Sequence, residues 1–314
     1  MPVQTFVEAP GPQGLLKGTM LSPGDSGAPI VLIIPGSGPT DQDGNSPLGV
    51  KSSPYRLLAE GLADKGVATV RIDKRGMFAS SAAIADANDV TIEAYANDIH
   101  VWIDAIRRGT GRSCVWVLGH SEGGLVALKA AQQPDGICGL VLVATAGRPL
   151  GEILREQLKA LSIGSLWDEA DSVISSLEAG KRVDASSLGS PLQRLFSPSV
   201  QGFLISELDL DPAKLAESYA GPVLIVQGDR DLQVGRADVE RLSQFNPTAK
   251  VVVLSGVNHV LKTVSSTTRE ANLATYADPD LPLGAGIVEA VADFVTARRA
   301  ADRQATDLSG SGLT

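Results

Sequence analysis

Short apolar runs that alternate with amphipathic helical patterns limit most strongly the folds open to this chain. The runs are rich in β-branched residues and lie at 30–34, 67–72, 114–118, 138–144, 222–227 and 249–254. Helical spacing of apolar residues lies between most of them, at 55–65, 91–108, 123–132 and 237–244. This alternation predicts an α/β fold with a mostly parallel central sheet and helices on both faces.

The sequence also indicates how one edge of the sheet is built. Residues 4–7 and 15–20 flank the segment APGPQG, a pattern typical of an antiparallel hairpin. The inner runs ICGLVLVAT and PVLIVQG are continuously apolar, whereas a strand with one face in water would alternate. We therefore expect the hairpin at the edge and the apolar strands inside.

The alternation stops between residues 148 and 219, where helical spacing continues without a strand candidate. We predict a core of residues 1–147 and 220–300 with a last helix over 286–299, a helical cap inserted at 148–219, and a disordered tail at 301–314. The apolar residues of the cap are expected mainly to pack against each other, with the lining of a substrate pocket as the alternative. They are Ile153, Leu158, Leu161, Leu166, Trp167, Ile174 and Leu177.

Composition narrows the range of partners. The chain has 314 residues and a formal net charge of −9, which argues against nucleic acid because phosphate binding requires clustered Lys and Arg. No run of apolar residues is long enough to span a membrane, so we expect a soluble protein. The first residues lack the basic and then apolar pattern of a secretory signal, so a cytoplasmic location is expected. Nothing in the sequence indicates an oligomeric state.

The chain has two cysteines, Cys114 and Cys138, each at the start of an apolar run. We expect them to be buried as small hydrophobic residues, with a disulfide or a reactive thiol as the alternatives. Neither lies in a CxxC motif or near a histidine, so no metal site is predicted.

A G-x-S-x-G pattern, Gly119 to Gly123, lies directly between a strand candidate and a helix candidate. A tight strand-to-helix turn strains the backbone of its serine, and flanking glycines prevent side-chain clashes there. The turn would present Ser121 at a helix N-terminus, where free N–H groups favour developing negative charge. We predict that Ser121 is a nucleophile, with an ordinary turn as the alternative.

A serine hydroxyl requires a base to accept its proton, and the chain has three histidines. His120 adjoins the serine within the turn and His100 lies in a helical run, so structural roles are expected for both. His259 follows the strand candidate 249–254, at the sheet end where parallel strands deliver their loops. It is also the only histidine after the serine, and we predict that it is the base.

The carboxylate that orients the base should follow a strand and precede the histidine. The segment PVLIVQGDRDLQV offers Asp229 and Asp231. We favour Asp231 because the longer turn allows its carboxylate to reach His259, and Asp229 stays open as the alternative. The carboxylate not used is expected to cap the turn or to pair with Arg230.

An oxyanion hole requires two backbone N–H donors. The first is expected from Glu122, the residue after the nucleophile. The second is expected from Ser37, in a loop where Gly36 and Gly38 allow the backbone to approach a ligand. A flexible surface loop is the alternative for this segment.

These segments resemble bacterial carboxylesterases of the α/β-hydrolase superfamily over about residues 31–295. The resemblance rests on PGSGPTDQDGN at 35–45, DKRG at 73–76, GHSEGG at 119–124, GDRDLQV at 228–234 and NHV at 258–260. It implies the α/β-hydrolase fold, the triad Ser121, Asp231 and His259, and small-molecule esters with short-to-medium acyl groups as substrates. Many relatives have His before the oxyanion glycine, whereas this chain has Pro35. The DKRG residues are expected to form ion pairs near the site, with Glu122 as a candidate partner.

The predicted reaction proceeds through an acyl-enzyme formed by attack of Ser121 on an ester carbonyl. His259 accepts the serine proton, protonates the leaving alcohol and then activates water. No cofactor or metal is required. The alternatives are an amidase or aminopeptidase with the same triad and, from another class, a noncatalytic hydrolase-fold protein that binds a small molecule or a protein.

Overall fold

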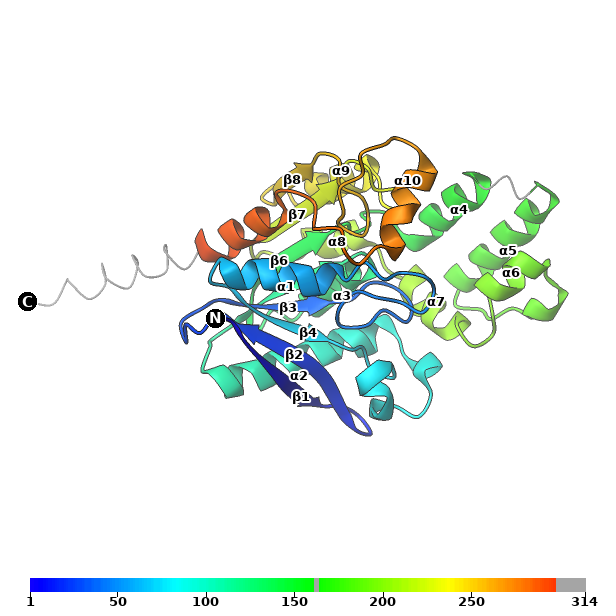
Figure 1. Ribbon diagram of the computed structural model, residues 1–314. Helices are drawn as coiled ribbons and strands as arrows, with labels where there is room; N and C mark the ends of the chain where they lie inside the picture. Colours follow the sequence, from blue (N-terminus) through cyan, green and yellow to red (C-terminus); the bar gives the residue numbers. More distant parts are fainter. Residues whose placement is uncertain (161–163, 298–314) are drawn as a thin grey trace, which may run out of the picture.

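The computed structural model describes residues 1–160 and 164–297. An eight-stranded sheet with the order β1-β2-β4-β3-β5-β6-β7-β8 forms its centre (Figure 1). The β1/β2 and β2/β4 pairs are antiparallel, and all pairs from β4 to β8 are parallel. The strands are β1 (Val3–Pro10), β2 (Leu15–Ser22), β3 (Ile30–Ile34), β4 (Ala68–Ile72), β5 (Val115–His120), β6 (Ile137–Val143), β7 (Val223–Gly228) and β8 (Lys250–Leu254). The prediction of a mostly parallel sheet with a hairpin at one edge is confirmed.

Alternate side chains of the inner strands build a separate core on each face of the sheet. On one face, residues such as Leu32 and Val117 pack with α2 (Ile92–Thr110), α3 (Glu122–Ala130) and α9 (Arg236–Phe245). On the other, their neighbours Ile33 and Leu118 pack with α1 (Pro54–Asp64) and the helical residues 287–297. Both faces are therefore covered, which explains why these strands are continuously apolar. Residues 298–299 of the expected last helix and the expected disordered tail at 301–314 lie outside the described residues.

Local signals set the ends of α2, the longest described helix. The Thr91 side chain accepts a hydrogen bond from the amide of Ala94 at 3.1 Å and so caps the first turn. At the other end, Gly111 has a φ of 71°, a left-handed conformation that glycine adopts without a steric penalty. The predicted helix 91–108 therefore agrees with the structure to within two residues at each end.

In its described part, the chain between β6 and β7 contains helices and no strand. Figure 1 shows α4, α5 and α6 to the right of the sheet. Leu158, Ile174 and Leu177 belong to a separate core in this segment, as expected, whereas Leu161 lies outside the described residues. The final helix of the segment packs on the sheet domain through Ala216. The helices are α4 (Leu150–Ala160), α5 (Trp167–Glu178), α6 (Ser190–Leu195), α7 (Gln201–Leu208) and α8 (Pro212–Glu217).

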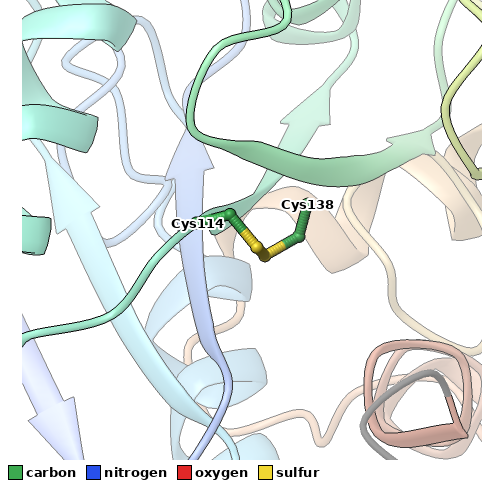
Figure 2. Close-up of a disulfide and its surroundings, with 2 residues drawn as sticks. All are labelled: Cys114 and Cys138. Atoms are coloured by element: carbon green, nitrogen blue, oxygen red, sulfur yellow. A yellow bond between two sulfur atoms is a disulfide. The ribbon is translucent and has the colours of Figure 1, made fainter. Parts of the chain in front are cut away.

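The expectation of two separate, buried cysteines is wrong, because Cys114 and Cys138 form a disulfide (Figure 2). Both residues are half-buried. Val115 pairs with Ile137 and Trp116 with Gly139, so Cys138 is the extra residue of a β-bulge between β5 and β6. Only the parallel pairing of these two strands brings the sulfur atoms together, and the disulfide therefore lies at the strand ends opposite Ser121.

Candidate active site

Ser121 lies in the turn between β5 and α3, between strand and helix as the sequence predicts. Its φ of 54° and ψ of −123° are strained for a residue with a side chain. The Ser121 amide donates a hydrogen bond to the carbonyl of Val143 at 2.9 Å. The turn thus holds the serine at the carboxyl end of the parallel strands and at the amino end of α3.

Two glycines permit this turn because backbone atoms approach them closely. A Cβ on Gly119 would lie 2.2 Å from the carbonyl oxygen of Gly123. A Cβ on Gly123 would lie 2.3 Å from the carbonyl oxygen of Ile34. Neither position has room for any other residue, as the mechanical argument for the motif requires.

The structure brings His259 and Asp231 together from the loops after β8 and β7. His259 Nδ1 and Asp231 Oδ2 are 2.8 Å apart, and the Asp231 side chain is 1% exposed. Burial alone would raise the pKa of Asp231. The His259 charge and hydrogen bond, together with the amides of Val234 and Gln233, outweigh burial and lower that pKa below its ordinary value. Asp231 is therefore an anion that can orient and stabilise an imidazolium.

Asp229, the alternative acid, makes its contacts with residues other than the histidine. Its Oδ1 accepts a hydrogen bond from the amide of Gly256 at 2.7 Å. Arg230 lies 3.8 Å from the same carboxylate. The pairing with Arg230 is one of the two roles expected for the carboxylate that does not serve the base, whereas the bond to Gly256 joins the loops after β7 and β8 and does not cap the turn.

Two cavities flank Ser121. The first, of about 180 Å³, is lined by Ser121, Glu122, Ile153 and Glu207 among others. The second, of about 200 Å³, is lined by Ser121 and His259 among others. No hydrogen bond joins Ser121 Oγ to His259 within the described residues. Catalytic hydrogen bonds are often long before substrate binds, so this geometry is compatible with a nucleophile and its base.

The two candidate oxyanion donors, Ser37 and Glu122, also lie on the wall of the first cavity. Glu122 is the first residue of α3, so its amide has no acceptor within the helix. A Cβ on Gly36 would lie 3.3 Å from Ser121 Cβ, which shows how closely the loop after β3 approaches the serine. Both residues therefore lie near the nucleophile, and their role as oxyanion donors stays a prediction.

A buried hydrogen-bond chain that involves Tyr55 and His120 could not be predicted from the sequence. The Gly36 amide donates to the Tyr55 hydroxyl at 3.1 Å, and that hydroxyl lies 2.9 Å from His120 Nδ1. His120 Nε2 lies 2.8 Å from the carbonyl oxygen of His259. Burial, and then the His259 charge, lower the pKa of His120 to about 3. A neutral His120 thus links the oxyanion loop to the backbone of the candidate base.

The DKRG segment anchors the same loop. Asp73 accepts hydrogen bonds from the amides of Gln42 at 2.8 Å and Ala79 at 3.2 Å. Lys74 Nζ donates to the Gly36 carbonyl at 2.6 Å and lies 3.5 Å from Glu122. Arg75, the third charged residue, pairs with Asp98 on α2. The expected ion pairs near the site, including the one with Glu122, are present.

The described part of the chain contains neither a metal-binding cluster nor a membrane-spanning helix. Residues 1–160 and 164–297 contain no cluster of His, Cys, Asp and Glu side chains arranged to hold a metal ion. None of their helices combines the length and apolarity needed to cross a membrane.

Comparison with known sequences gives two matches. A family model described as serine aminopeptidase, S33, matches residues 48–186. Esterase EstD from Thermotoga maritima is 28% identical over 255 residues, which are 78% of this chain and 58% of that protein. This chain therefore spans less than three fifths of the length of that curated relative.

Several solved structures resemble this chain. Est1E from Butyrivibrio proteoclasticus with bound ferulic acid has a TM-score of 0.56 at 20% identity, over 90% of this chain and 92% of that one. Pyrococcus furiosus esterase Pf2001 has a TM-score of 0.56 at 16% identity, over 82% and 84%. The α/β hydrolase GrgF from Penicillium sp. sh18 has a TM-score of 0.57 at 18% identity, over 82% and 91%. The structural matches show that the chain has the α/β-hydrolase fold, and its sequence is similar to the serine aminopeptidase family model and to EstD.

Proposed function

We propose that this chain hydrolyses carboxylic esters of small molecules through an acyl-enzyme on Ser121. The observation that carries the proposal is the 2.8 Å contact between Asp231 and His259 beside a serine with a strained backbone. EstD from Thermotoga maritima and the structurally similar Pf2001 from Pyrococcus furiosus are both named esterases, which supports the same class of reaction.

The reaction begins when Ser121 Oγ attacks the ester carbonyl carbon and His259 Nε2 accepts the hydroxyl proton. The amides of Ser37 and Glu122 hold the oxyanion that forms. Protonated His259 then gives its proton to the alcohol oxygen, and the C–O bond breaks. Water, deprotonated by the same histidine, attacks the acyl-enzyme and regenerates Ser121. Ionised Asp231 stabilises the imidazolium in both halves of the reaction.

We also propose that residues 148–219 act as a cap that shapes the substrate site. Arg148, Ile153 and Glu207 line the first cavity beside Ser121, which supports a role in recognition. The proposed short-to-medium acyl preference rests on the family resemblance and the cavity volume of about 180 Å³.

The disulfide bears on the expected cytoplasmic location. Disulfides persist in oxidising compartments and are rare in the cytosol. The Cys114–Cys138 bond therefore argues for an oxidising environment and against that expectation.

Labelling with a fluorophosphonate, together with hydrolysis of p-nitrophenyl acetate, butyrate and octanoate, tests the proposed reaction. We expect stoichiometric labelling of the wild type, and a loss of ester turnover of about 10⁴-fold or more in Ser121→Ala. Ser81→Ala, which removes an exposed serine hydroxyl, is the matched control and should retain both signals. Retained turnover in Ser121→Ala would overturn the proposal.

An amidase stays a second candidate because the matched family model is described as a serine aminopeptidase. The same triad cleaves amides when it protonates the leaving amine. Aminoacyl p-nitroanilides separate the two activities. Labelling with turnover of anilides and none of esters would favour the amidase.

A further inference from the structure

The two cavities at Ser121 face different parts of an ester. His259 lines the second cavity and is absent from the described lining of the first. Because protonated His259 must reach the leaving oxygen, the alcohol of the ester lies on the side of the second cavity. The first cavity, which we call the acyl-side cavity, is left for the acyl group.

The acyl-side cavity contains two buried carboxylates, Glu122 and Glu207. Their residues are 8% and 9% exposed. Glu122 Oε1 is buried without a hydrogen-bond partner in the described chain. No described residue donates a hydrogen bond to the Glu207 carboxylate, which lines the same cavity. A carboxylate that is nine-tenths buried almost always has a partner, so Glu207 has acceptor capacity left for a ligand in this cavity.

The positive charges nearby do not balance the pair. Lys74 is the cation beside it, 3.5 Å from Glu122 Oε1, and its ammonium donates to a backbone carbonyl. That separation is too long for a good hydrogen bond. Arg148 also lines the cavity, but its guanidinium is already bound by Asp238 and Glu156. One ammonium therefore faces two carboxylates.

The charge imbalance contributes to the raised pKa of Glu207. Burial, and then the Glu122 charge, raise the pKa of Glu207 well above its ordinary value, while Lys74 opposes this effect. A cation bound between the two carboxylates would oppose the effect of the Glu122 charge, as Lys74 does. A neutral aliphatic group would instead leave two desolvated carboxylates that share one ammonium, Lys74, which is costly.

We propose that Glu122 and Glu207 bind a protonated amine carried by the acyl group, so that the substrates are esters of short amino acids. This inference rests on the proposed ester hydrolysis. An ammonium supplies three hydrogen-bond donors and one positive charge, which match the unpaired oxygen atoms and the excess negative charge. Because Glu122 adjoins Ser121, the amine lies only a few bonds from the reacting carbonyl.

The competing arrangement is a proton held between Glu207 and Glu122. Such a proton would satisfy both carboxylates without a ligand. The acyl-side cavity would then accept neutral acyl groups as readily as charged ones, and this difference makes the two arrangements separable by kinetics.

The test compares phenyl esters of β-alanine and butyric acid, whose acyl groups have the same number of non-hydrogen atoms and differ in an ammonium for a methyl group. We expect the wild type to favour the β-alanyl ester by about 10-fold or more in kcat/KM at pH 7.5. Glu207→Gln should bring the ratio close to one by raising KM for the β-alanyl ester far more than KM for the butyryl ester. Glu207→Asp should restore part of the preference.

Glu152→Gln on α4 is the matched control, because it removes an exposed carboxylate that does not line the acyl-side cavity. It should keep the wild-type ratio. A wild type that hydrolyses the butyryl ester as fast as the β-alanyl ester overturns the inference, whether or not Glu207→Gln folds. If the wild type shows no preference but is labelled by the fluorophosphonate and hydrolyses the butyryl ester, the proposed ester hydrolysis is still supported. If it is not labelled and hydrolyses neither ester, both the ester hydrolysis and the amine-binding site are contradicted.

Discussion

The carboxylates on the two sides of Ser121 differ in their hydrogen bonds. We call the side of the loops after β7 and β8 the sheet side, and the side of the acyl-side cavity the helical side. Asp231, on the sheet side, has both oxygens occupied: Oδ1 by the amides of Gln233 and Val234, and Oδ2 by His259 and the Gln227 side chain. On the helical side, Glu122 Oε1 is buried without a hydrogen-bond partner in the described chain. The loops at the sheet ends therefore complete their own polar network, which keeps reactive groups in place. The helical side leaves charge available for recognition.

The largest expected effect tests whether the bonding of Asp231 matters for catalysis. Asp231→Asn should lower kcat by roughly 10⁴-fold while the fold is kept, because the amide cannot stabilise the imidazolium and favours the wrong tautomer. Steady-state hydrolysis of p-nitrophenyl butyrate measures the loss.

Asp229→Asn is the control for that change, since it alters a carboxylate two residues away that bonds to Gly256. It should retain turnover within a few-fold. Equal losses of kcat in Asp231→Asn and Asp229→Asn would show that catalysis does not depend on the contact between Asp231 and His259. The hydrogen bonds of Asp231 would then have no special importance for turnover.

The next effect separates the stability of the sheet from the chemistry at its other end. Removal of the disulfide in Cys114→Ser/Cys138→Ser should lower the free energy of unfolding by about 3 kcal/mol, because the bond closes a loop with a sequence separation of 24. Denaturant unfolding measures this change. Turnover of the folded variant should match the wild type, because the disulfide lies at the strand ends opposite Ser121. An unchanged unfolding midpoint would contradict the expected stabilisation.

The smallest expected effect concerns the buried histidine of the sheet side. An unfolded histidine binds a proton below about pH 6.5, whereas burial lowers the pKa of His120 to about 3. Between these values the unfolded state holds more protons, so the free energy of unfolding falls as pH falls. The slope from this single group reaches about 1.4 kcal/mol per pH unit.

His120→Gln should remove that slope, because glutamine can still bond to Tyr55 and to the His259 carbonyl but does not take up a proton. Unfolding by urea between pH 4.5 and 7.5 measures the difference. His100→Gln, a half-buried histidine on α2, is the matched control. An identical pH dependence in wild type and His120→Gln would show that His120 is not held neutral by burial.

The predictions from sequence succeeded where local pattern and fold agree. The strand and helix patterns around Gly119–Gly123 place Ser121 in its turn, and the structure keeps it there. The position of His259 followed from the end of one strand. The choice of Asp231 over Asp229 was harder, because two residues of one loop differ only in the direction in which the turn points their carboxylates. The tertiary structure separates them by their hydrogen bonds.

Other features had no local signal. Cys114 and Cys138 meet only because β5 and β6 pair in parallel with a bulge, so their bond depends on register. Glu207 lies in the apolar stretch GFLISELDL, and nothing near it in sequence shows that α7 brings it to the acyl-side cavity. Tyr55 and His120 likewise meet across a separation of 65 residues.

The sequence by itself determined the layered fold and the choice of Ser121, His259 and Asp231 as candidates for acyl transfer, because hydrophobic period and turn chemistry are local properties of the chain. The tertiary structure alone decided which carboxylates are paired and which are left buried without partners. That outcome depends on the distances between side chains from different strands and helices, and such distances are set only when the helices pack against the sheet.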